Sequence, residues 1–202
     1  MPAPEPLTNP LRLRGFPVST FTRTAAMTCI EKGVPYELVP IGYGSAEHAA
    51  LHPFTRMPVL EHGDVVVFET LAVTNYIDAA FEGPALQPAA LPARTKMLAW
   101  MSLCADYIFR DVVRGLPRRE PPTGEELAAA RRALELVDRM VSSPFLAGDS
   151  LSLADLYLAP QISNAREKAP EVLDGLGAIE AWFTGIAARE SFERTAYDPS
   201  TV

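Results

Sequence analysis

Residues 56–70 constrain the fold more than any other part of this chain. They read Arg-Met-Pro-Val-Leu at 56–60, a turn at 62–64 (His-Gly-Asp), and Val-Val-Val-Phe-Glu-Thr at 65–70. Two short apolar runs on either side of a Gly-Asp turn predict a β-hairpin. Pro58 opens the first run, where its missing N–H costs no ladder bond if the strand ends or forms an edge there.

The hairpin runs directly into a helical pattern at residues 71–81 (LAVTNYIDAAF). Glu69 and Thr70 stand at the junction of strand and helix. A carboxylate and a hydroxyl at a helix N-terminus can cap the helix, or can hold the charged end of a ligand beside free backbone N–H groups. Both uses are open at this point.

The segment before the hairpin adds two strands and a helix. The elements expected over residues 1–83 are a strand at 11–14, a turn at 15–20, a helix at 21–32 closed by Gly33, a strand at 36–41, a loop at 42–56 with room for one helical turn at 45–50, the hairpin, and the helix at 71–81. Pro40 favours an edge position for the strand at 36–41. This order predicts a small α/β domain.

Composition changes after Gly83. Prolines at 84, 88 and 92 predict a stiff linker at 84–93. Residues 94–202 are then helical in pattern, with capping boxes that begin at Thr123 and at Ser152. The predicted fold is therefore an α/β domain at 1–83, the linker, and an all-α domain at 94–202.

The net charge excludes two kinds of partner, and the cysteine content indicates the cellular compartment. The net charge of −7 argues against nucleic acid and against anionic membrane surfaces. Only two cysteines occur, Cys29 and Cys104, both within apolar helical stretches, which favours buried thiols in a reducing cytoplasm. The N-terminal sequence lacks the features of a secretory signal, and no stretch approaches the roughly 18 apolar residues of a membrane span. We expect a soluble cytoplasmic protein.

The ordered block from Met57-Pro58 to Glu69-Thr70 resembles the glutathione-binding half of cytosolic glutathione S-transferases. In that family a cis-proline is followed by a strand, a turn, a strand and a Glu-Ser or Asp-Ser pair. Residues 145–155 (FLAGDSLSLAD) are similar to the family's buried capping box in the second domain. The resemblance implies a thioredoxin-like first domain, glutathione as co-substrate, a small hydrophobic electrophile as partner, a role in detoxification and a homodimer.

The resemblance assigns thiol activation to Ser19. Residues 16–23 (FPVSTFTR) are similar to the serine-type, phi-like and theta-like members, with Arg23 four residues beyond the serine. A free thiol has a pKa of about 8.5, so ionising it near pH 7 needs roughly 2 kcal/mol, which a hydroxyl donor at a helix N-terminus can supply. Gly15 stands where tyrosine-type members place their hydroxyl, and 16–23 contains no cysteine for the disulfide chemistry of other members. A helix N-cap is the alternative role for Ser19, and Thr20 is a rival donor.

The resemblance also implies contacts for the tripeptide. It places the γ-glutamyl end on Glu69 and Thr70, and pairs the cysteinyl backbone with Met57 beside Pro58. Arg56 can meet a carboxylate of the peptide.

The loop at 45–53 is similar to the family's Ser-Pro-Glu-Phe-x-x-x-Asn-Pro, but His48 replaces an apolar residue and His52 replaces the asparagine. Taken alone, this segment is typical of a solvated loop. The two histidines have a helical metal spacing, yet no HExxH pattern accompanies them and Pro53 ends any helix, so we expect no metal site.

A second-substrate pocket is expected on the first helix of the helical domain, at Trp100, Leu103, Tyr107 and Arg110. A stripe of this spacing is also typical of plain core. The leading functional hypothesis is a transferase that conjugates glutathione thiolate to small hydrophobic electrophiles. The alternatives are a non-catalytic binding protein for glutathione or hydrophobic ligands, and a glutathione-dependent isomerase or dehalogenase.

Overall fold

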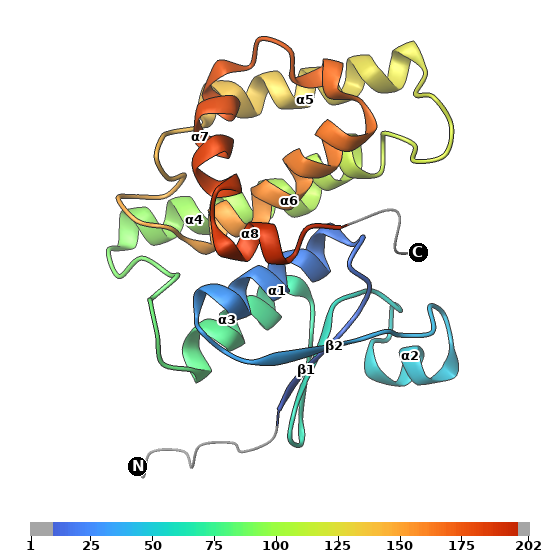
Figure 1. Cartoon of the computed structure of the whole chain (residues 1–202), viewed down its shortest axis with the longest axis vertical. Coiled ribbons are helices and arrows are strands. Elements are labelled where there is room, and N and C mark those ends of the chain that lie inside the picture. Colours follow the sequence, from blue (N-terminus) through green and yellow to red (C-terminus); the bar gives the residue numbers. More distant parts are fainter. Residues whose placement is uncertain (1–9, 198–202) are drawn as a thin grey trace. The chain divides into compact units, whose positions relative to one another are not determined.

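A computed structural model describes residues 10–197 of the chain (Figure 1). The chain divides into two compact units. The first contains residues 10–84 together with 194–197, and the second contains residues 85–193.

The first unit is built on a four-stranded mixed sheet in the order β2-β1-β3-β4. Its strands are β1 (Leu11–Arg14), β2 (Tyr36–Val39), β3 (Val59–His62) and β4 (Val65–Phe68). β1 is parallel to β2 and antiparallel to β3, and β3 and β4 form the predicted hairpin. Pro58 directly precedes β3 and its peptide bond with Met57 is cis. β2 occupies a sheet edge, as Pro40 predicted.

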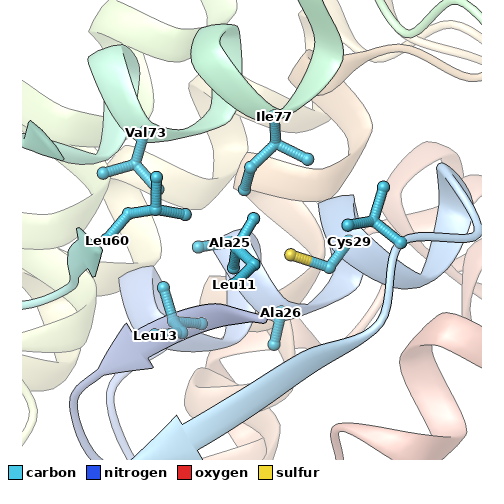
Figure 2. Close-up of a cluster of buried hydrophobic side chains, with 9 residues drawn as sticks. Leu11, Leu13, Ala25, Ala26, Cys29, Leu60, Val73 and Ile77 are labelled. Carbon is cyan, nitrogen blue, oxygen red and sulfur yellow. The ribbon is translucent and has the colours of Figure 1, made fainter. Parts of the chain in front are cut away.

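Three helices accompany this sheet: α1 (Thr20–Glu31), α2 (Ala46–Leu51) and α3 (Thr70–Ala80). α1 and α3 pack on each other and contact the sheet. Figure 2 shows the resulting core, in which strand side chains meet side chains of both helices: Leu11, Leu13, Leu60, Ala25, Ala26, Cys29, Val73 and Ile77. The predicted thioredoxin-like α/β fold is confirmed.

A buried ion pair joins the two helices of this core. Lys32, the C-cap residue of α1, places its Nζ 3.2 Å from Oδ1 of Asp78 on α3, and the two side chains are only 3% and 7% exposed. A buried charge without its partner is costly, so each member of this pair depends on the other.

The second unit is entirely helical, as predicted. Its elements are α4 (Leu91–Leu103), the π-helix η1 (Cys104–Val113), α5 (Gly124–Met140), α6 (Leu153–Lys168), the 3-10 helix η2 (Pro170–Leu173), α7 (Gly177–Ala187) and α8 (Glu190–Arg194), whose last residue belongs to the first unit. α4 begins inside the range 84–93 that the prolines marked as linker. Pro92 is tolerated there because an N–H in the first helical turn needs no intrahelical partner.

Both predicted capping boxes are present. The second centres on Asp155, which is fully buried. Its Oδ1 accepts from Leu146 N and Trp182 Nε1, both at 2.9 Å, and its Oδ2 accepts from Ser152 N at 2.9 Å and Ser152 Oγ at 3.0 Å. Burial raises the pKa of Asp155, and the four donated bonds oppose that rise. The box fixes the start of α6 against the preceding loop and α7.

Candidate functional site

Three sequence-predicted segments meet at one end of the sheet in the first unit. The register pairs Arg14 with Val59, and Val59 with Phe68, in one row across three strands. The chain leaves this row from Arg14 toward Ser19, enters it from Met57-Pro58, and leaves it again at Glu69. The strand pairing therefore brings the predicted thiol-activating and glutathione-binding segments to the same end of the sheet.

Ser19 is the N-cap residue of α1. Its Oγ accepts from Thr22 N at 3.3 Å, and its backbone N–H donates to Phe16 O at 3.0 Å. The expected capping role is present. A hydroxyl also has one proton to donate, so accepting the capping bond leaves that proton available. Thr20, the rival donor, is 5% exposed, and its Oγ1 has no hydrogen-bond partner.

Gly15 leaves no room for a side chain at the tyrosine-type position. A Cβ built there would lie 2.4 Å from Thr22 Oγ1, on the first turn of α1. Thr22 is buried and β-branched, so it has little freedom to move away. The close approach of β1 to α1 therefore requires glycine.

The loop before the cis-proline is tied down by His48. This residue is fully buried, its Nδ1 accepts from Gly44 N at 3.2 Å, and its Nε2 lies 2.9 Å from Arg56 O. Because Nδ1 accepts, the proton must be on Nε2, which donates to the Arg56 carbonyl. The Arg56 side chain itself is exposed. His48 thus fixes the backbone directly before Met57.

Glu69 has an unusual backbone conformation, with φ of 69° at the N-cap position of α3. Non-glycine residues adopt this region rarely, and such strain gathers at functional sites. Its side chain forms no capping bond to α3 and is 64% exposed. Of the two uses that the sequence left open, capping is therefore absent, and the carboxylate at the start of α3 is directed to solvent. Thr70 is the first residue of that helix.

His52 stands beside this carboxylate. It is 1% exposed, its Nδ1 accepts from Phe54 N at 3.2 Å, and its Nε2 lies 3.6 Å from Glu69 Oε1. The solvated-loop interpretation of the two histidines is wrong, because both are buried and bonded. No local pattern signals this burial, because the fold brings Arg56 O to His48 and Glu69 to His52.

His48 and His52 do not belong to any cluster of potential metal ligands in the described part of the chain. Within residues 10–197, no group of three or more His, Cys, Asp or Glu side chains is placed to bind a metal ion.

The four residues predicted for a second-substrate pocket differ in exposure. Trp100 on α4 is 2% exposed and belongs to the core, in agreement with the alternative interpretation, while Leu103 is half-buried. Tyr107 on η1 is 56% exposed, and the Arg110 guanidinium lies 5.5 Å from its ring centroid. Arg110 also donates to both carboxylate oxygens of Asp111, at 2.6 and 2.8 Å.

A cavity of about 360 Å³ on the helical unit contains none of these four side chains. It lies between the end of α6 and the start of α7, and is lined by Arg166, Pro170, Leu173, Asp174, Gly175, Leu176, Gly177 and Glu180.

Comparison with known proteins identifies the family. The family model of the glutathione S-transferase N-terminal domain matches residues 13–85, and that of the C-terminal domain matches residues 95–190. Glutathione S-transferase 3 of Zea mays is 30% identical over 207 residues, covering 92% of this chain and 93% of the relative. The chain belongs to the glutathione S-transferase family.

Solved structures of glutathione S-transferases agree with this assignment. The structure of glutathione S-transferase I bound to lactoylglutathione superposes with a TM-score of 0.78 at 27% identity, covering 93% of this chain and 99% of that one. The apo structure of glutathione S-transferase III gives a TM-score of 0.79 at 26% identity, covering 93% and 95%. The predicted family is confirmed.

No described helix has both the length and the apolar character needed to cross a membrane.

Proposed function

We propose that this glutathione S-transferase conjugates the thiolate of glutathione to small hydrophobic electrophiles. One observation carries the proposal. The sheet register places a hydroxyl at the start of α1, a cis-proline backbone, and an exposed carboxylate at the start of α3 at the same end of one sheet. These are the groups that a tripeptide with a thiol and an ammonium end requires.

In this proposal Ser19 stabilises the thiolate. Its hydroxyl proton is donated to the sulfur while its oxygen keeps the capping bond from Thr22 N. The N-terminus of α1 adds partial positive charge at the same place. Together they favour the charged thiolate over the neutral thiol, which is the selective stabilisation that nucleophilic attack at neutral pH needs.

The amino end of glutathione is assigned to Glu69. Its carboxylate is exposed, makes no capping bond, and can pair with an ammonium group beside the Thr70 hydroxyl. Backbone pairing with Met57 next to Pro58 and a carboxylate contact at Arg56 complete the proposed site. Replacement of Glu69 by alanine is expected to abolish retention on immobilised glutathione, whereas Glu82→Ala, at an exposed acid, is the matched control. Equal retention of the Glu69 variant and the wild type would refute the placement.

Thiol titration tests the role of Ser19. Ser19→Ala is expected to raise the thiol pKa of bound glutathione and to slow conjugation about ten-fold or more, less than the loss of an oxyanion donor, because the helix N–H groups remain. Thiolate absorbance is titrated in the complexes of the wild type, Ser19→Ala and Thr20→Ala. A pKa change only in Thr20→Ala moves the role to Thr20, and no change in either variant refutes catalysis by a hydroxyl of this turn.

The class of electrophile is tested by a substrate panel. Glutathione is combined with aryl halides, peroxides and a maleyl-type substrate. Conjugation of aryl halides is the expected result and fits a detoxifying role. Exclusive turnover of the maleyl-type substrate or reductive loss of halide would instead identify an isomerase or dehalogenase.

We propose further that the protein is a cytoplasmic homodimer. Several apolar side chains of the first unit are exposed on the edge strand β4, the start of α3 and the loop after α2, namely Phe54, Val66, Phe68 and Leu71 at 76%, 47%, 40% and 50%. Exposed apolar groups of this kind mark interaction surfaces. Light scattering is expected to give a dimer mass that Phe54→Ser shifts toward monomer, while Leu136→Ser, at an exposed leucine of α5, does not. A monomeric wild type would refute the proposal.

A further inference from the structure

His52 is held in one tautomer by its surroundings. Its Nδ1 accepts from Phe54 N, so the single proton of the neutral ring is on Nε2, which lies 3.6 Å from Glu69 Oε1. The ring also packs on Phe68, with the ring centroids 4.9 Å apart. The imidazole is thereby fixed by its own loop on one side and by the end of β4 on the other.

We infer that His52 is a positioning residue for Glu69, orienting its carboxylate for the amino group of glutathione when neutral and competing with that amino group when protonated. This inference rests on the proposed function of Glu69.

Burial and the charged neighbours of His52 shift its pKa in opposite directions. Burial lowers the pKa of His52 below its ordinary value of 6.5, the Glu69 carboxylate raises it, and His48 and Arg56 lower it. The net direction is downward, so the ring is neutral at pH 7. The contact with Glu69 at that pH is therefore between a neutral N–H and a carboxylate, which leaves the negative charge available to a ligand.

Protonation changes both sides of the ring. A proton on Nδ1 would face the Phe54 N–H donor, so the bond that now fixes the ring is lost. The resulting cation lies beside the Glu69 carboxylate and neutralises it. An incoming ammonium group then meets a paired carboxylate and a neighbouring positive charge, so glutathione binds more weakly.

The test is the pH dependence of glutathione affinity in three proteins. His52→Asn retains an oxygen that can accept from the N–H two residues ahead and an amide donor, but it does not titrate. His62→Gln is the matched control, because His62 is also buried but contacts Tyr76 Oη at 3.1 Å. Dissociation constants of S-methylglutathione, which has no thiol to ionise, are measured by calorimetry between about pH 5 and pH 7, where its amino and carboxyl groups keep their charge.

For the wild type and His62→Gln, Kd is expected to rise toward acid, by about two-fold at the pKa of His52 and by at most about ten-fold per pH unit below it. The Kd of His52→Asn is expected to match that of the wild type near pH 7 and to stay nearly constant toward acid. A parallel rise in the wild type and His52→Asn would overturn the inference.

A second measurement separates this inference from the proposed function. The His52 ring is titrated by NMR in the ligand-free protein and in Glu69→Gln, which removes the charge but keeps the shape. The pKa of His52 is expected to fall further in the variant, because the carboxylate is the group that raises it. An unchanged pKa overturns the coupling even if glutathione binds, whereas a coupled pair in a protein without glutathione affinity would refute the proposed function of Glu69.

Discussion

Replacing Asp155 by asparagine tests how much of the helical unit's stability depends on one carboxylate. The carboxylate accepts four bonds, two on each oxygen, from Leu146 N, Trp182 Nε1, Ser152 N and Ser152 Oγ. Asparagine keeps the volume but exchanges one oxygen for an NH₂ group. If the NH₂ replaces Oδ1, Leu146 N and Trp182 Nε1 both face a donor, whereas if it replaces Oδ2, only Ser152 N does, because the Ser152 hydroxyl can rotate and accept.

The expected cost follows from this count. The amide is expected to turn its NH₂ toward Ser152, because that orientation leaves one donor without an acceptor rather than two. A buried donor left without its partner costs about 1–3 kcal/mol, so the substitution predicts a loss of about that size in unfolding free energy. Against a total of about 5–15 kcal/mol, this is a substantial fraction of the stability of the protein.

Urea unfolding followed by tryptophan fluorescence measures the effect, since Trp182 is itself one of the donors. Asp149→Asn, at an exposed acid of the same loop, is the matched control and is expected to leave the midpoint unchanged. A loss below about 1 kcal/mol for Asp155→Asn would refute the count of unsatisfied donors.

Three further outcomes are expected. Lys32→Met removes the cation that faces the buried Asp78 carboxylate, which costs about 3–5 kcal/mol in urea unfolding, and adding Asp78→Leu is expected to recover part of that loss; no recovery would contradict the pairing. The pKa of His52 in the folded protein lies below the ordinary value of 6.5, so between the folded and the unfolded pKa the unfolded chain binds more protons. The unfolding free energy therefore falls as pH drops through this window, and the urea midpoint of His52→Asn is expected to lack this fall. Burial raises the pKa of Cys29 to about 12 and raises that of Cys104 as well, so a thiol reagent at about pH 8 is expected to modify neither cysteine until the protein unfolds. Fast labelling of the native protein would contradict the burial of the two thiols.

The features predicted correctly from the sequence are those with local signals. The hairpin at 56–70 follows from its turn and apolar runs, and the boxes at Thr123 and Ser152 follow from short spacings that need no distant partner. The N-cap role of Ser19, which was the alternative to thiol activation, depends on a local signal of the same kind. Its role toward a thiol, in contrast, was assigned by resemblance and stays a prediction.

The features that the sequence did not reveal depend on distant groups or on backbone detail. His48 and His52 are buried because a loop folds back on the hairpin, and nothing within the loop indicates this. The φ of 69° at Glu69 is imposed where β4 meets α3. The π-helix at Cys104–Val113 has i→i+5 hydrogen bonds in place of the i→i+4 bonds of an α-helix, a change that the apolar pattern of this segment did not predict.

The division of the chain has a consequence for biosynthesis. Because residues 194–197 belong to the first unit, the helical unit is an insertion within it. Arg23 Nε on α1 donates to Thr195 Oγ1 at 3.2 Å, so this contact joins two segments that are 172 positions apart in the sequence. A ribosome that has released residues 10–84 has delivered the whole sheet and all three of its helices, yet not the segment that contacts α1. The first unit is therefore the first to emerge and the last to be completed, and its final contacts form only after the whole helical unit has been translated.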